Sequence, residues 1–80
     1  MTREELVNII QDNYPTLVFN FNNKKCGIDI EVDNSIPKFQ SWFGEKIKFY
    51  DDINAMLDDD FFDGKSLSKL VENGIEIDFI

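Results

Sequence analysis

The residue types with the most chemical potential in this 80-residue sequence lie between Asp58 and Ser66, where an acidic run precedes a glycine, a lysine and a serine. Gly64-Lys65-Ser66 matches the end of a phosphate-binding loop, but Asp59 stands where that loop requires its first glycine. The acidic and aromatic residues upstream of Gly64 would repel a phosphate. We therefore interpret the segment as a turn followed by a helix cap.

The same segment can be compared with a calcium-binding loop. With Gly64 at the glycine position of such a loop, Asp59 and Asp63 occupy ligand positions. Phe61 and Leu70 then stand where two further carboxylate ligands are required, so most of the coordination is lost. The metal hypothesis that is left is a loose divalent-cation site formed by Asp58, Asp59, Asp60 and Asp63. No specific metal site is predicted.

Catalytic groups are scarce in this chain. There is no histidine, which excludes serine–histidine and cysteine–histidine pairs as well as imidazole metal ligands. Cys26 lies beside Lys24 and Lys25, whose charges would lower its pKa, but no base is available to activate it. Paired carboxylates of a glycosidase would need a sugar-sized cleft, which a chain of this length can hardly enclose. We predict that the protein is not an enzyme.

Negative charge is concentrated on one predicted strand. Apolar residues alternate with acids over 28–33, a pattern typical of a strand with one apolar face and one acidic face. The acids of this strand are Asp29, Glu31 and Asp33. Such carboxylates are about 6.7 Å apart, so one stripe has roughly a quarter of the charge density of DNA. Acids that the fold could bring alongside are Asp51, Asp52, Glu76 and Asp78. The alternative is a plain solvated face.

A predicted hairpin contains a second candidate surface. Its aromatic interaction candidates are Phe39, Trp42, Phe43 and Tyr50. Tyrosine and tryptophan anchor many protein interfaces. If the hairpin has a two-residue turn, Trp42 faces Ile47 and Gln40 faces Phe49. Both faces then carry aromatic rings, so either a helix covers the second face or some rings are exposed. The alternative is that the rings belong to the core.

The first half of the chain is predicted to contain a helix and two strands. Thr2 and Glu5 form a capping box at the start of the helix, and Pro15 ends it. Apolar residues that alternate with others over 17–21 indicate the first strand. The residues 22–27 are interpreted as a turn that leads into the acidic strand.

The second half is predicted to form a hairpin, two short helices and a last strand. Its segments are a loop over 34–37, hairpin strands over 38–43 and 46–50 joined at Gly44-Glu45, and a strand over 75–79. Asp51 or Asp52 caps the first short helix, which the following acidic run should end. Asp63 or Ser66 starts the second, and Asn73-Gly74 closes it. The predicted fold is a single α+β domain over 1–80, with an N-terminal helix and a mainly antiparallel sheet of four or five strands.

Composition limits the kind of partner. Sixteen acidic and eight basic residues give a net charge of −8 at pH 7, which argues against direct binding to nucleic acid or to an anionic membrane. A partner guided by charge should be basic; alternatively, the charge only keeps the domain soluble. Cys26 is the single cysteine, so no intramolecular disulfide can form, and this favours a reducing cytoplasm. No segment has the length and apolarity of a membrane span.

Two functions from different classes are compatible with these features. The first is a non-catalytic interaction module whose acidic face binds and modulates a basic protein, with a nucleic-acid-handling enzyme as the favoured class of target. Small acidic inhibitors and immunity proteins, including those of phages and plasmids, resemble this chain in size and charge only. The second is a structural protein that self-associates as a homodimer through the aromatic hairpin face. Neither function involves a predicted cofactor.

Overall fold

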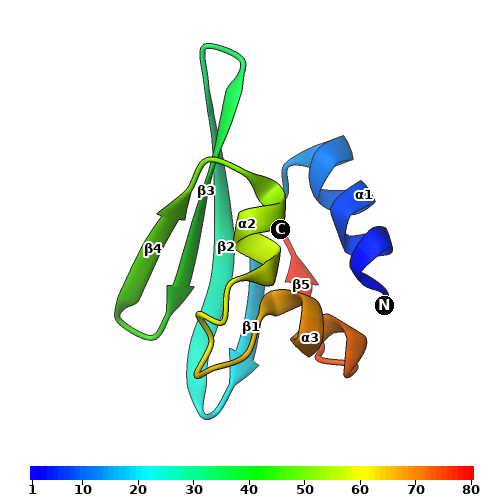
Figure 1. Cartoon of the computed structure of the whole chain (residues 1–80), viewed down its shortest axis with the longest axis vertical. Helices are drawn as coiled ribbons and strands as arrows, with labels where there is room; N and C mark the ends of the chain where they lie inside the picture. Colours follow the sequence, from blue (N-terminus) through cyan, green and yellow to red (C-terminus); the bar gives the residue numbers. More distant parts are fainter.

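A computed structural model of the chain describes all 80 residues and confirms the predicted α+β fold. Its elements are α1 (Arg3–Asn13), β1 (Leu17–Phe21), β2 (Lys24–Asp33), β3 (Ile36–Phe43), β4 (Lys46–Tyr50), α2 (Ile53–Asp58), α3 (Leu67–Glu72) and β5 (Asp78–Phe79). The strands form one five-stranded sheet in the order β4-β3-β2-β1-β5, and every neighbouring pair is antiparallel (Figure 1). Strands β1 to β4 are therefore consecutive neighbours, and β4 and β5 are the two edges.

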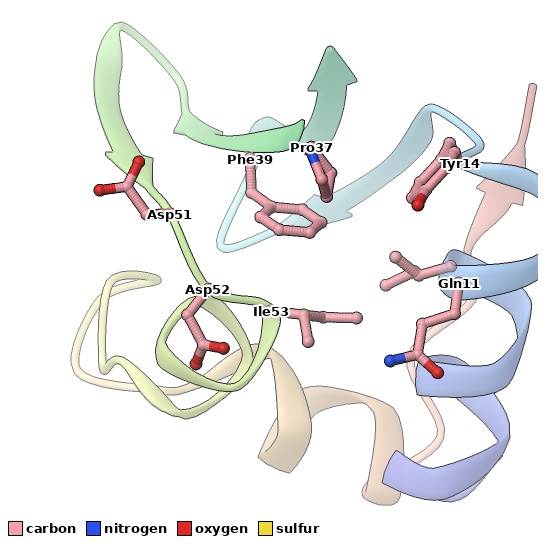
Figure 2. Close-up of a pocket in the computed structure, with 8 residues that line it drawn as sticks. Gln11, Tyr14, Pro37, Phe39, Asp51, Asp52 and Ile53 are labelled. Carbon is pink, nitrogen blue, oxygen red and sulfur yellow. The ribbon is translucent and has the colours of Figure 1, made fainter. Parts of the chain in front are cut away.

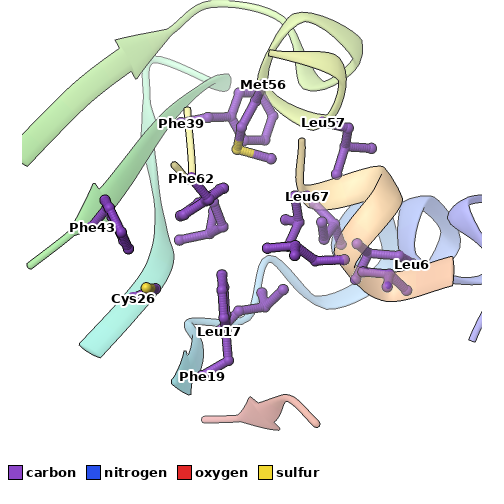
Figure 3. Packing of buried hydrophobic residues seen from close by; sticks show 14 of the residues in the cluster. Leu6, Leu17, Phe19, Cys26, Phe39, Phe43, Met56, Leu57, Phe62 and Leu67 are labelled. Carbon is purple, nitrogen blue, oxygen red and sulfur yellow. The ribbon is translucent and has the colours of Figure 1, made fainter. Parts of the chain in front are cut away.

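All three helices cover the same face of the sheet. In β1 and β3 buried residues alternate with more exposed ones, and the cross-strand register puts Phe19, Ile28 and Phe43 on the same side of the sheet. The helices contribute the other half of the core, including Leu6 from α1 and Met56 from α2 (Figure 3). The 15 buried hydrophobic residues form one cluster. The opposite face of the sheet has no covering layer.

Predicted helix caps define where the helices begin. Thr2 and Glu5 form the capping box of α1, with the Glu5 amide donating to the Thr2 hydroxyl at 3.1 Å. The carboxylate of Asp52 accepts from the Ala55 amide and starts α2, and the hydroxyl of Ser66 starts α3 in the same way. Each cap satisfies a backbone donor that the first helical turn leaves free.

The predicted turn over 22–27 and the predicted loop over 34–37 are both wrong in extent. Asn22-Asn23 and Asn34-Ser35 are two-residue turns whose residues all have positive φ values, between 52° and 65°. This conformation matches the twist of a hairpin, and asparagine tolerates it better than most residues. As a result, β2 begins at Lys24, and Pro37 lies within β3, where it pairs with Val32.

The hairpin of β3 and β4 agrees with the predicted register. Gly44 has a φ of 59° at the first position of the turn, whereas Glu45 has no positive φ, as a type II′ turn requires. Trp42 is opposite Ile47, and Gln40 is opposite Phe49. The register places the side chains of these four residues on the face of the sheet that the helices do not cover.

The last strand is shorter than the predicted 75–79. Only Asp78 and Phe79 pair with β1. The amide of Ile75 donates to the Leu70 carbonyl at 3.0 Å, which closes α3 instead of joining a ladder. The Ile75 amide is therefore bonded to α3 and is not free to pair with β1, as a strand that began at residue 75 would require.

Candidate interaction surface

The sheet face opposite the helices, called the open face here, is the largest structural feature without a covering layer. The strand alternation and register place on it Val18, Asn20, Lys25, Gly27, Asp29, Glu31, Asp33, Ile36, Lys38, Gln40, Trp42, Ile47, Phe49 and Asp78. Acidic, basic and apolar side chains are thus mixed on this face. When helices cover only one face of an antiparallel sheet, the other face is solvated unless a partner covers it.

Trp42 is the centre of the open face. Gly27 lies opposite it on β2, and a Cβ atom added at Gly27 would overlap the six-membered ring of the indole and the Leu17 carbonyl oxygen. The indole therefore lies directly over the glycine and fills the space of its missing side chain. This contact half-buries Trp42 although no helix covers it. Glycine in a strand interior commonly marks such a close approach.

Beside Trp42, the edge strand β4 exposes two large apolar side chains. Ile47 is 56% exposed and Phe49 is 70% exposed. Ile47 is the cross-strand neighbour of Trp42, so the three side chains form a continuous apolar strip, defined here as Trp42, Ile47 and Phe49. Single exposed apolar residues are common, but a contiguous aromatic and aliphatic strip is typical of a contact site.

Two of the predicted acidic residues flank this strip. Asp29 lies on β2 and accepts a hydrogen bond from the Thr16 hydroxyl at 3.2 Å. Glu31 lies two residues further along, directly opposite Lys38 on β3, which interrupts the acidic stripe with a positive charge. These residues, with Gln40 and Phe49, line a shallow hollow of about 70 Å³. Carboxylates therefore lie beside the exposed Phe49 ring.

Of the other predicted acidic residues, only Asp33 shares this face of β2, at the end of the β2–β3 hairpin. Asp78 is on β5, on the far side of Val18, and Glu76 precedes that strand. Asp51 and Asp52 follow β4 and line a separate groove. The structure therefore keeps the three acids of β2 on one face and separates the rest of the predicted acidic set from them.

The predicted aromatic set is wrong for all but one of its members. Phe39, Phe43 and Tyr50 are buried in the core, because the helices cover their face of the hairpin. Only Trp42 is on the open face. The aromatic residue with the greatest exposure, Phe49, was not among the candidates, although the predicted register placed it opposite Gln40. The missing information was which face of the hairpin the helices would cover.

The acidic run at the end of α2 does not form a cation site. Asp58 pairs with Arg3 at 3.0 Å, and Asp59 accepts from the Lys48 ammonium at 2.7 Å and from the Tyr50 hydroxyl at 2.6 Å. These hydrogen bonds lower the pKa of both carboxyl groups. Asp63 instead accepts from the Asn22 amide. No group of three or more carboxylates or cysteines is suited to hold a metal ion.

Cys26 lies in the core rather than in a turn. It is fully buried in β2, with its thiol 3.4 Å from the Lys24 carbonyl oxygen. Burial raises its pKa, and this effect outweighs the lowering by the charge of Lys24. The predicted lowering of the pKa is therefore wrong, because desolvation dominates. At neutral pH the side chain is a protonated thiol.

A groove of about 190 Å³ lies between α1 and the start of α2 (Figure 2). Phe39 and Pro37 of β3 form one wall, and Tyr14 and Gln11 lie on the opposite side. The only carboxylates of the lining are Asp51 and Asp52, and Asp52 is already engaged in capping α2. The groove is smaller than the pockets that enclose drug-sized ligands, which are about 300 Å³ or more. The groove is therefore a weaker candidate for a binding site than the open face.

Comparisons with family models, with curated proteins and with solved structures found no match to this chain. None of its helices is long and apolar enough to cross a membrane.

Proposed function

We propose that this protein is a non-catalytic interaction module that binds a basic protein through the open face of its sheet and thereby modulates it. The observation that carries the proposal is the apolar strip of Trp42, Ile47 and Phe49, exposed next to the carboxylates of Asp29 and Glu31. A site of this composition combines apolar burial with selection by charge.

Apolar burial provides the affinity in this proposal. Covering the side chain of Phe49 is worth about 1.5–3 kcal/mol of transfer free energy, and Ile47 adds a similar gain. Aromatic residues at the centre of an interface are frequently the ones whose truncation weakens binding most. Phe49 and Trp42 are therefore the proposed anchors, and Trp42 is the one member of the predicted aromatic set among them.

Charge provides the selectivity. The net charge of −8 attracts a basic surface and repels nucleic acid and anionic lipid. In this proposal Asp29 and Glu31, on the open face of β2, meet lysine or arginine side chains around the apolar contact. A nucleic-acid-handling enzyme, which has a basic groove, fits this requirement, and a reducing cytoplasm suits the unpaired Cys26. Inhibitor or immunity activity is the corresponding mode of modulation.

The test compares the natural sequence with Phe49→Ser as immobilised baits in extract of the native host. We expect a basic protein to bind the natural sequence at about 0.05 M salt and to be lost at about 0.5 M, because screening weakens charge attraction. Phe49→Ser should lose the same protein at low salt. A matched control, Phe79→Ser, removes an exposed phenylalanine from the opposite edge and should retain it. Equal capture by all three baits would refute the proposal.

Self-association is the second candidate, and the exposure of Phe49 favours it. The homodimer would use the open face, because the rings of the predicted face are buried. Light scattering after size-exclusion chromatography, from micromolar to submillimolar concentration, tests it. A dimer that Phe49→Ser dissociates would support this function, whereas a monomer throughout would reject it.

A further inference from the structure

The edge strand β4 has backbone amide and carbonyl groups that are not paired with β3, and they belong to the same two residues, Ile47 and Phe49, whose side chains are exposed. Its type II′ turn is a four-residue β-turn, whose hydrogen bond joins Phe43 and Lys46. Bonded and non-bonded pairs alternate along an antiparallel ladder, so Ser41 and Lys48 form the next bonded pair. Ile47 and Phe49 are in the non-bonded pairs. Their amide and carbonyl groups therefore point away from β3, toward the open edge.

Nothing else in the structure satisfies these outward groups. Of the backbone hydrogen bonds outside regular elements, none involves a residue of β4. No other strand lies beyond β4 in the sheet (Figure 1). An unpaired edge of this kind is a template for an additional strand.

The edge has little of the protection that edge strands usually carry. Lysine side chains commonly block such edges, and β4 has Lys46 and Lys48. Lys48, however, forms a salt bridge with Asp59 at 2.7 Å, so its charge is compensated within the molecule. Lys46 is the one uncompensated lysine on the strand. The side chains of Ile47 and Phe49 extend on the open face, where they would contact an added strand.

The charges at the end of β4 indicate what that strand should carry. Asp51 and Asp52 follow the strand directly and are exposed, and Glu45 precedes it. A second copy paired antiparallel through β4 about Lys48 would bring Glu45 of one chain toward Asp51 of the other at both ends of the pairing. These like charges disfavour a second copy. Lysine or arginine at the ends of an added segment would be attracted instead.

We propose that an extended segment of the basic partner adds to β4 as a sixth strand, with apolar residues beside Ile47 and Phe49 and basic residues beside Asp51 and Asp52. This inference rests on the proposed function and specifies how the partner is held. Main-chain hydrogen bonds to Ile47 and Phe49 provide the pairing, and alternate side chains provide the specificity.

Synthetic peptides test the added strand directly. The probe is Lys-Lys-Thr-Val-Thr-Val-Thr-Lys-Lys, whose two valines lie opposite Ile47 and Phe49 when it pairs antiparallel to β4, and its control has glutamate in place of every lysine. A second control carries N-methyl groups on both valines, which removes the donors that would face β4. We expect the basic probe to shift the NMR signals of the Ile47 and Phe49 amides and to slow their hydrogen exchange. Both controls should bind at least about tenfold more weakly.

Two variants of the protein complete the design. Ile47→Pro removes an outward donor without removing a bond to β3, because Ile47 is in a non-bonded pair. Should this variant fail to fold, Asp51→Lys tests the charge requirement and should weaken binding of the basic probe roughly tenfold. Its control is Glu72→Lys at the end of α3, which changes the net charge equally and should leave binding unchanged.

The outcomes separate this inference from the proposed function. One outcome is that the NMR signals of Asp29 and Glu31 shift while those of β4 do not, whether or not the peptide is N-methylated. This outcome overturns the added strand and leaves binding to the open face intact. Absence of any shift at millimolar probe also overturns it. Protection of the Ile47 and Phe49 amides in the protein alone, rising with its concentration, identifies a second copy and overturns the basic segment. The proposed function itself fails only if Phe49→Ser leaves capture of the partner unchanged.

Discussion

The indole of Trp42 lies directly over the Cα atom of Gly27, so one residue on β3 occupies the side-chain position of another on β2. This contact orders a large aromatic ring on a face that no helix covers. It also fixes the surface next to Ile47, the neighbour of Trp42 on the edge strand. The central part of the open face is thus set before any partner binds, which reduces the entropy lost on binding.

Gly27→Ala should destabilise the fold by about 1–3 kcal/mol, because the added methyl group overlaps both the Trp42 ring and the Leu17 carbonyl oxygen. Urea unfolding followed by circular dichroism measures the loss. The double variant Gly27→Ala, Trp42→Ala should lose less than the sum of the two single variants, since it removes the ring from the overlap. Stability of Gly27→Ala equal to that of the natural sequence would contradict the packing.

Phe49→Ser should change the free energy of unfolding by no more than about 0.5 kcal/mol, because most of its side chain is already in water. Phe62→Ala is the matched comparison. Its ring is fully buried and contacts Phe19 with ring centroids 5.3 Å apart, so its truncation should cost about 3–5 kcal/mol. Thermal unfolding of the two variants tests this difference. A large loss for Phe49→Ser would mean that the ring supports the fold rather than a contact.

Asp59 should contribute to stability in a pH-dependent way. Hydrogen bonds from Lys48 and Tyr50 lower its folded-state pKa below the ordinary value of 3.8. Its contribution is therefore present above pH 3.8 and is lost as the pH falls through the lower, folded-state pKa. Asp59→Asn should be less stable at neutral pH and should have a shallower loss of stability in acid. The measurement is urea unfolding at a series of pH values, and parallel curves would argue against the interaction.

Tyr50 should give the opposite dependence at high pH. Burial and the neighbouring carboxylate of Asp59 raise the folded-state pKa of its hydroxyl above the ordinary value of 10.0. The unfolded chain then loses the proton first, so the contribution is complete below pH 10.0 and is lost as the pH rises. Tyr50→Phe should unfold at a higher pH than the natural sequence in an alkaline titration at fixed urea. An identical alkaline midpoint would contradict this prediction.

Cys26 should be unreactive until the protein unfolds. The side chain is fully buried, and burial raises the pKa of the thiol, so both access and thiolate content are low. Reaction with Ellman's reagent should be slow in the native state and should follow the urea unfolding transition. Lys24→Ala serves as a control, because it removes a nearby charge without opening the core. Rapid labelling of the native protein would show that β2 is accessible.

Local signals in the sequence were sufficient for much of the fold. The hydroxyl and carboxylate caps at Thr2, Asp52 and Ser66 depend only on nearby residues, and all are present. The register of Trp42 opposite Ile47 followed from the length of one turn. The two positive-φ turns were harder to predict, because Asn22-Asn23 and Asn34-Ser35 contain no glycine to mark them.

The site required information that is not local. Both faces of the β3–β4 hairpin carry aromatic rings, and the covered face is set by tertiary packing against α2 and the rest of the core. That choice decides whether Phe43 or Phe49 is exposed. The acidic residues likewise divide according to strand order and loop paths, so counting charges could not predict which of them lie together.

Two-residue turns join β1, β2, β3 and β4 in chain order, and this has a consequence for the order of folding. Each pairing in this part of the sheet joins segments adjacent in the chain, and sequence-local contacts form fastest. The pairing of Leu17 with Phe79 is the exception, since it spans nearly the whole chain. During synthesis the four-strand meander can therefore assemble first, while the sheet is completed only when β5 emerges from the ribosome. Until then β1 is a second unpaired edge, and the growing chain is most exposed to mispairing at that stage.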